Sequence, residues 1–119
     1  MAITKILLSG GGTDGKPFQS DGINNHTIHT ASSNATDIDE VWLWACNVSA
    51  ADVVTTVGWG RAGYTASNNI FTVTSKTGLY LITPGLVLKG NAGVPKIATV
   101  FAASASSINW VGYVNRHSV

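Results

Sequence analysis

The chain is divided into short apolar segments, rich in Val, Ile and Thr, that are separated by clusters of Gly, Pro, Asn and Ser. The segments recur at intervals of roughly 8–12 residues, and none shows the 3.6-residue period of an amphipathic helix. Candidate strands lie at residues 2–9, 25–31, 38–48, 53–59, 70–75, 79–83, 86–88, 97–103 and 108–115. In this pattern Pro84 and Gly85 form a turn. We therefore expect an all-β fold, an antiparallel β-sandwich or barrel, jelly-roll-like, of about eight short strands.

Residues 38–48 give the strongest strand pattern. Alternate positions are apolar on both of its faces: Val41, Leu43 and Ala45 on one, and Trp42, Trp44 and Cys46 on the other. A strand that is apolar on both faces is typical of the centre of a sheet that protein covers on both sides. We accordingly expect a buried Cys46 thiol and tryptophans that fill the core, with exposure as an alternative for Trp59 at its glycine-flanked strand end.

Length and charge restrict the classes of function. We expect residues 1–119 to form a single β domain. Seven Lys and Arg residues and six Asp and Glu residues give a net charge of +1. This charge is too small to attract nucleic acid or an anionic membrane surface electrostatically. No apolar run is long enough to span a membrane, and no signal peptide follows Met1, so we expect synthesis in the cytoplasm.

The N-terminal segment leaves two interpretations open. Residues 1–22 are a possible N-terminal arm and Gly-rich loop, in which Ile3, Ile6, Leu7 and Leu8 would bind a partner by strand addition. Alternatively, residues 2–9 are the first strand of the sandwich. Residues 10–16 have the spacing of a phosphate-binding loop, but Pro17 replaces the required Ser or Thr and no helical pattern follows. We interpret them as a surface turn.

No catalytic, cofactor or metal site is expected, and the chain does not read as an enzyme. His26 and His29 are three residues apart on a candidate strand, so they point to opposite faces unless a bulge intervenes. Asp37 and Asp39 would share a strand face, but hard cations require about six oxygen ligands, and we interpret these residues as a solvated strand entry. No Gly-x-Ser-x-Gly segment positions a nucleophile.

Five segments resemble, in the same order, segments of small virion proteins of tailed bacteriophages. They are TIHTA (27–31), DIDEVWLWACN (37–47), PGLVL (84–88), VFAASA (100–105) and GYVNR (112–116). Together they span most of the chain, although each encodes strands and turns rather than chemistry. The sequence departs from the pattern at residues 89–96, where the turn is longer, and it continues past Arg116.

The resemblance implies a capsid decoration (cement) protein, a small β-sandwich or barrel that is commonly trimeric and binds over junctions between capsid subunits. The implied partners are the major capsid protein and other copies of the chain in a homotrimer, and the implied location is the capsid surface of the virion. The alternative is a carbohydrate- or receptor-binding β module associated with a tail or fibre. That alternative predicts an exposed Trp59 or Tyr64 beside polar side chains.

Overall fold

The computed structural model describes residues 2–8, 15–60 and 68–118. The described residues form nine β-strands and no helix, so none of them belongs to a helix that could cross a membrane. The strands are β1 (Ala2–Leu8), β2 (Phe18–Gln19), β3 (His26–Thr30), β4 (Ile38–Asn47), β5 (Val53–Gly60), β6 (Asn68–Val73), β7 (Leu79–Lys89), β8 (Ile97–Ala102) and β9 (Ile108–Ser118).

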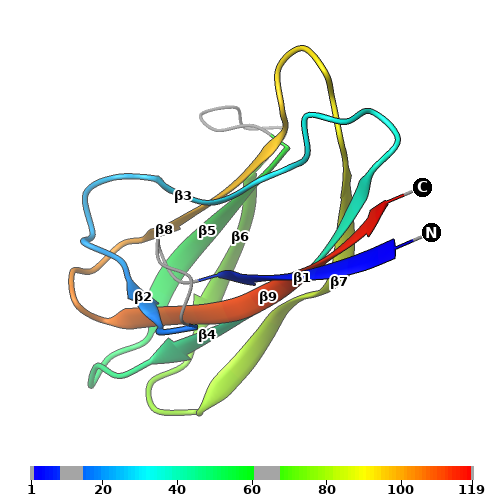
Figure 1. Ribbon diagram of the computed structural model, residues 1–119. Coiled ribbons are helices and arrows are strands. Elements are labelled where there is room, and N and C mark those ends of the chain that lie inside the picture. The colour runs from blue at the N-terminus through cyan, green and yellow to red at the C-terminus, as the bar shows by residue number, and fades with distance from the viewer. Residues whose placement is uncertain (1, 9–14, 61–67, 119) are drawn as a thin grey trace.

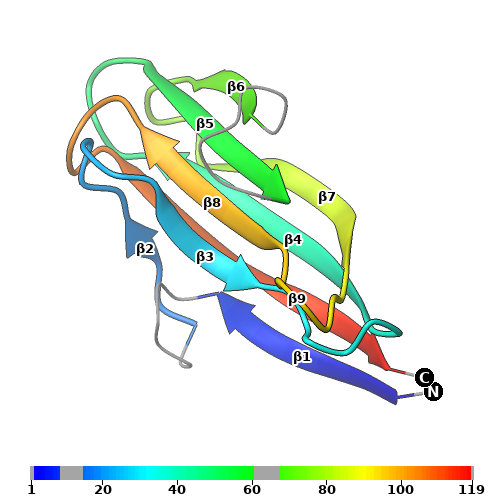
Figure 2. The ribbon, with the colours of Figure 1, turned by 90° about the horizontal axis from the view of Figure 1, so that it is seen from above.

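The strands form two antiparallel sheets that pack face to face (Figure 1). The five-stranded sheet has the order β1-β9-β4-β7, with the short β2 also paired to β9, and the four-stranded sheet has the order β3-β8-β5-β6. Figure 2 shows that the strand axes of the two sheets are nearly aligned with each other, as in an aligned sandwich. This strand order is that of a jelly roll. The predicted fold class is confirmed.

Alternation along each strand creates the core between the sheets. Val41, Leu43 and Ala45 of β4 are 0–1% exposed and join one apolar cluster with residues of β5, β8 and β9. Trp110 of β9 is 1% exposed, as expected for a core tryptophan, and its indole Nε1 donates a hydrogen bond to Ser20 Oγ. The indole nitrogen is therefore satisfied although the ring is buried.

The expectation that protein covers both faces of β4 is wrong. β4 lies between β9 and β7, yet only its inward face is buried, and Trp42, Trp44 and Cys46 on the opposite face are half-buried at the surface of the molecule. A jelly roll has two layers only, so each sheet keeps one outer face. The apolar pattern of that outer face reflects contacts among surface side chains rather than a third layer.

The predicted turn at Pro84 and Gly85 is also wrong. β7 continues through both residues, and its pairing with β4 shifts register between Val41 and Trp42. Gly85 has φ +77°, and a Cβ there would lie 3.0 Å from Cζ2 of Trp42. The two residues therefore form a β-bulge that bends β7 and leaves room for the Trp42 ring.

Gly112 of β9 permits a close approach between the backbones of β9 and β4. It pairs with Leu43 of β4 on one side and with Leu8 of β1 on the other. A Cβ at this position would overlap the Trp42 carbonyl oxygen, so only glycine lets the two strands meet here.

Candidate functional site

The outer face of the five-stranded sheet carries a group of apolar side chains. Pairing aligns Trp42 with Tyr113, Tyr113 with Leu7, and Trp44 with Leu81. Trp42, Trp44 and Tyr113 alternate with buried residues along β4 and β9, so they point away from the four-stranded sheet. The pairing places Leu7 and Leu81 on the same outer face. We call this surface the aromatic face, defined by Ile3, Leu7, Trp42, Trp44, Leu81 and Tyr113.

The three aromatic rings of this face contact one another. Trp42 and Trp44 stack with centroids 6.4 Å apart and an interplanar angle of 22°, and Trp42 and Tyr113 stack at 6.4 Å and 20°. The Trp44 and Tyr113 centroids are 6.0 Å apart. Such offset arrangements are the favoured ones for aromatic pairs. The rings therefore form a preorganised apolar surface rather than independent side chains.

The charged groups beside the rings are already paired. Glu40 accepts a hydrogen bond from Trp42 Nε1 at 2.7 Å and one from Asn115 Nδ2 at 3.3 Å, and these bonds hold the pKa of its carboxyl below the ordinary value. The Lys5 ammonium lies 4.3 Å from the centroid of the Tyr113 ring, a cation–π contact. The two charged groups that border the aromatic face, Lys5 and Glu40, thus both contact its rings.

Several aliphatic side chains of this face are exposed. Ile3 is 62% exposed, Leu7 41% and Leu81 40%. Single exposed aliphatic residues are ordinary, but apolar side chains that gather on one face are typical of an interaction site. The aromatic face is therefore the candidate interaction surface. Among the described residues, no group of three or more His, Cys, Asp or Glu side chains is placed to hold a metal ion.

The four predicted partner-binding residues lie on β1, which pairs along its length with β9 at the edge of the sheet. Leu8 is buried in the core and Ile6 packs against it, whereas Ile3 and Leu7 point outward on the aromatic face. In this conformation the segment is the first strand of the sandwich. Its role in binding a partner stays a prediction, now divided between two inward and two outward side chains.

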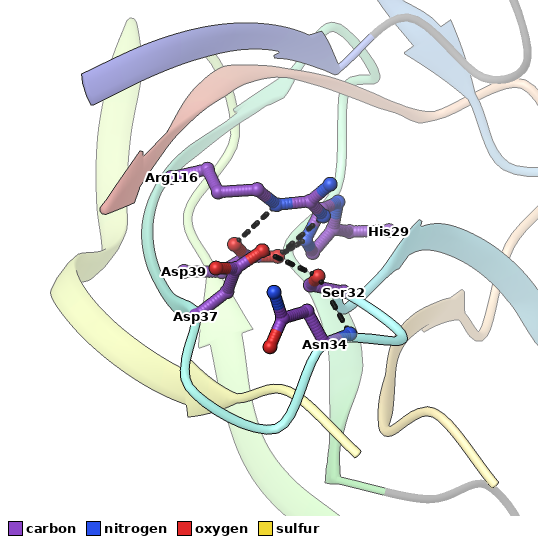
Figure 3. Close-up of polar contacts among 6 residues, drawn as sticks. All are labelled: His29, Ser32, Asn34, Asp37, Asp39 and Arg116. Carbon is purple, nitrogen blue, oxygen red and sulfur yellow. Dashed lines mark hydrogen bonds and ion pairs between the residues drawn. The ribbon is translucent and has the colours of Figure 1, made fainter. Parts of the chain in front are cut away.

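A buried polar cluster lies at the N-terminal end of β4, around Asp39 (Figure 3). Asp39 is 0% exposed, and its carboxylate accepts hydrogen bonds from Arg116 Nε at 2.7 Å and Nη2 at 2.9 Å. Asp39 Oδ2 lies 2.6 Å from His29 Nε2. Next to this group, Ser32 Oγ donates to Asp37 Oδ2 at 2.6 Å. The cluster joins β3, β4 and β9.

Burial and pairing set the protonation states of this cluster. Burial alone would raise the pKa of the Asp39 carboxyl, but hydrogen bonds from Arg116 and His29 outweigh it, and the pKa lies below its ordinary value. Burial lowers the pKa of His29, and Asp39 offsets this only in part because Arg116 already compensates the carboxylate. His29 is therefore neutral at pH 7 and donates its Nε2 proton to Asp39.

The interpretation of Asp37 and Asp39 as a solvated strand entry is wrong, since Asp37 is 7% and Asp39 0% exposed. The cluster contains Ser, His and Asp, but Ser32 donates to Asp37 and does not face His29. The side chain of His29 is only 4% exposed, so substrate has no access to it. The arrangement is that of a structural ion pair that holds three strands together.

Other predicted residues lie apart from both groups. The register of β3 shifts between Thr27 and His29, so His26 pairs with Val100 and His29 with Ala98, which lie on one face of β8, and the two histidines do not point to opposite faces. They have different partners: His26 Nε2 lies 3.2 Å from Asp21 Oδ1, and its ring packs edge-on against Phe18. Trp59 is half-buried and packs against the core. Tyr64 and most of the glycine-rich segment 10–16 lie outside the described residues.

Comparisons with known proteins add no functional assignment. No family model matches the chain, and no curated protein matches it. A chain from a solved structure titled "Bacillus endospore appendages form a novel family of disulfide-linked pili" matches with a TM-score of 0.49 and 9% identity, over 99% of this chain and 88% of that one. At this level the likeness bears on neither function nor partners.

Proposed function

We propose that the chain is a non-enzymatic virion structural protein, a capsid decoration protein that binds over junctions between major capsid protein subunits of a bacteriophage head. Two features support the proposal: the ordered resemblance of five segments to small phage virion proteins, and the aromatic face on a nearly neutral domain. The aromatic face carries the argument, because it is the surface whose burial would stabilise an assembly.

The composition of the aromatic face fits a protein partner. Trp and Tyr are enriched at the centres of protein interfaces, where Lys and Glu are depleted. Glu40, which lies beside the rings, already accepts hydrogen bonds from Trp42 and Asn115, so a partner need not supply a donor for it. Complete burial of an exposed Leu or Ile contributes about 1.5–3 kcal/mol, before the costs of association. We therefore expect burial of Ile3, Leu7 and Leu81 to contribute much of the free energy of attachment.

A matched pair of substitutions tests the proposal. Leu81→Asp places a charge in the aromatic face, and Val54→Asp places the same charge at a similarly exposed position of the four-stranded sheet, the two residues being 40% and 48% exposed. We expect Leu81→Asp to lower the affinity for capsid shells that lack the protein by at least about tenfold, because the charge must be desolvated on binding. Val54→Asp should bind as the wild type does. Co-sedimentation with purified shells measures both.

Equal binding of the two variants would contradict attachment through the aromatic face. Labelling of intact particles supplies the second test: label on the shell supports the decoration role, and label confined to the tail contradicts it. The alternative, a tail- or fibre-associated carbohydrate- or receptor-binding module, relies on exposed Trp59 or Tyr64. Because Trp59 packs against the core, its position does not favour that alternative.

A further inference from the structure

The outer face of the four-stranded sheet, opposite the aromatic face, contains a hollow of ≈220 Å³ lined by Ile23, Asn25, Thr56, Asn68 and Phe101. Thr56 of β5 pairs with Phe101 of β8, and Gly58, two residues further along the same face, pairs with Asn68 of β6. Pairing thus brings Phe101, Thr56 and Asn68 from three adjacent strands to one part of this outer face.

The lining combines one aromatic ring with three neutral polar side chains. Asn25, Thr56 and Asn68 make no side-chain hydrogen bond to another described residue, so two amides and one hydroxyl are available as donors and acceptors. None of the five lining residues is charged. A phosphate or carboxylate would meet no cation among these described lining residues, whereas a neutral polyhydroxylated ring finds hydrogen-bond partners and an aromatic surface for its C–H groups.

The size and position of the hollow further restrict the kinds of ligand that it can bind. Its volume lies below the roughly 300–1,000 Å³ typical of sites for drug-sized molecules, so it accommodates one small ring. It lies over β5 and β8, which are the two central strands of the sheet. Their backbone groups are paired on both sides, so an extended peptide cannot bind here by adding a strand.

We propose that this hollow binds a single neutral sugar residue of a glycan. Phe101 packs against the ring, and Asn25, Thr56 and Asn68 bind its hydroxyl groups. The proposal is independent of the decoration role. It is compatible with that role, because a domain attached through the aromatic face leaves the outer face of the four-stranded sheet exposed.

Nuclear magnetic resonance of the ¹⁵N-labelled protein tests the proposal, with glucose, galactose, mannose and N-acetylglucosamine added separately. We expect at least one sugar to shift the side-chain amide signals of Asn25 and Asn68 in a saturable manner. Thr56→Val keeps the shape of the side chain and removes one hydroxyl, and it should weaken binding by roughly tenfold. Thr72→Val is the matched control, because Thr72 lies on the same face of β6 but does not line the hollow.

Two results would overturn the proposal: no shift of the Asn25 and Asn68 signals with any of the four sugars, or equal affinity of Thr56→Val and Thr72→Val. Leu81→Asp separates this inference from the decoration role. It should bind the sugar as the wild type does while its attachment to capsid shells is weakened, so each proposal fails on its own measurement.

Discussion

Asp39 determines how the end of the sandwich is held together. A fully buried carboxylate is costly unless it is paired and hydrogen-bonded, and Asp39 has Arg116 in a two-bond contact on one side and His29 on the other. The three residues come from β9, β4 and β3, which belong to both sheets. A single buried charge thus ties the C-terminal strand to the opposite layer.

Removal of Arg116 tests this role. Arg116→Ala leaves the Asp39 carboxylate buried without its cation, and we expect a loss of about 3 kcal/mol in the free energy of unfolding. Arg116→Lys should cost less, since it retains the charge but not the planar pair of donors. Urea titration measures both. Lys5→Ala, which removes an exposed cation from the same sheet, is the control, and a loss as large as that of Arg116→Ala would contradict the explanation.

His29 makes stability depend on pH in a definite direction. Its pKa in the folded protein lies below the ordinary 6.5, so the unfolded chain binds more protons as the pH falls through that value. The free energy of unfolding should therefore decrease from pH 7 toward pH 5, by at most about 1.4 kcal/mol per pH unit for one proton. His29→Gln keeps an N–H donor for Asp39, in the form of a side-chain amide, and cannot titrate. Thermal unfolding of this variant should show a shallower decrease, and an unchanged pH profile would show that His29 is not responsible.

The positions of Asp39 and Arg116 follow from alternation, but their partnership does not. Asp39 is in phase with Val41, Leu43 and Ala45, and Arg116 with Val114 and Trp110, so the sequence contains the signal that both point inward. A charged residue type favours a solvated position, but the alternation along the strand places Asp39 on the buried face. Which cation meets which carboxylate depends on the register of β4 against β9, where Asp39 pairs with Arg116, and that register is not visible in a single sequence.

At the scale of the strands, β7 shows where local sequence rules mislead. Pro and Gly in succession usually indicate a turn, and the sequence predicted two strands of residues 79–83 and 86–88. The structure instead has one strand, Leu79–Lys89, because the bulge retains pairing with β4 on both sides of Gly85. β4 is long enough to pair with both halves, and this tertiary contact overrides the turn preference.

β1 has two faces with different consequences for substitution. Ile6→Ser and Leu8→Ser remove apolar groups that contact the core, and each should lower the free energy of unfolding by about 2 kcal/mol or more. Ile3→Ser and Leu7→Ser change exposed side chains, so they should leave stability nearly unchanged while lowering the affinity for capsid shells. Denaturant titration and co-sedimentation measure the two effects. If all four variants bind shells normally, β1 is a structural strand without a role in attachment.

At the scale of the whole molecule, strand spacing is sufficient to predict an all-β sandwich or barrel, and the pairing of the strands into two separate sheets decides for the sandwich. Turn residues at short intervals together with period-2 alternation exclude other fold classes, and eight of the nine strands overlap segments expected from the sequence. The surface was less predictable. Trp42 and Trp44 are large and apolar, as core residues are. Only the structure, in which the opposite face of β4 packs against the second sheet, shows that their face is the outer one. The hollow beside Phe101 depends on three paired strands and has no local signal.

The exposed apolar area leads to a prediction for the free protein. A domain with so little charge and an apolar outer face has little repulsion to prevent association, and the edge strand β1 is exposed over most of its length. We expect a homotrimer at micromolar concentration, the assembly that the phage resemblance implies. Size-exclusion chromatography with light scattering measures the mass. The mass should change little between low and moderate salt, because apolar contacts are not screened. A monomer under all these conditions would contradict self-association of the free chain, and dissociation by salt alone would show that charge pairs hold it together.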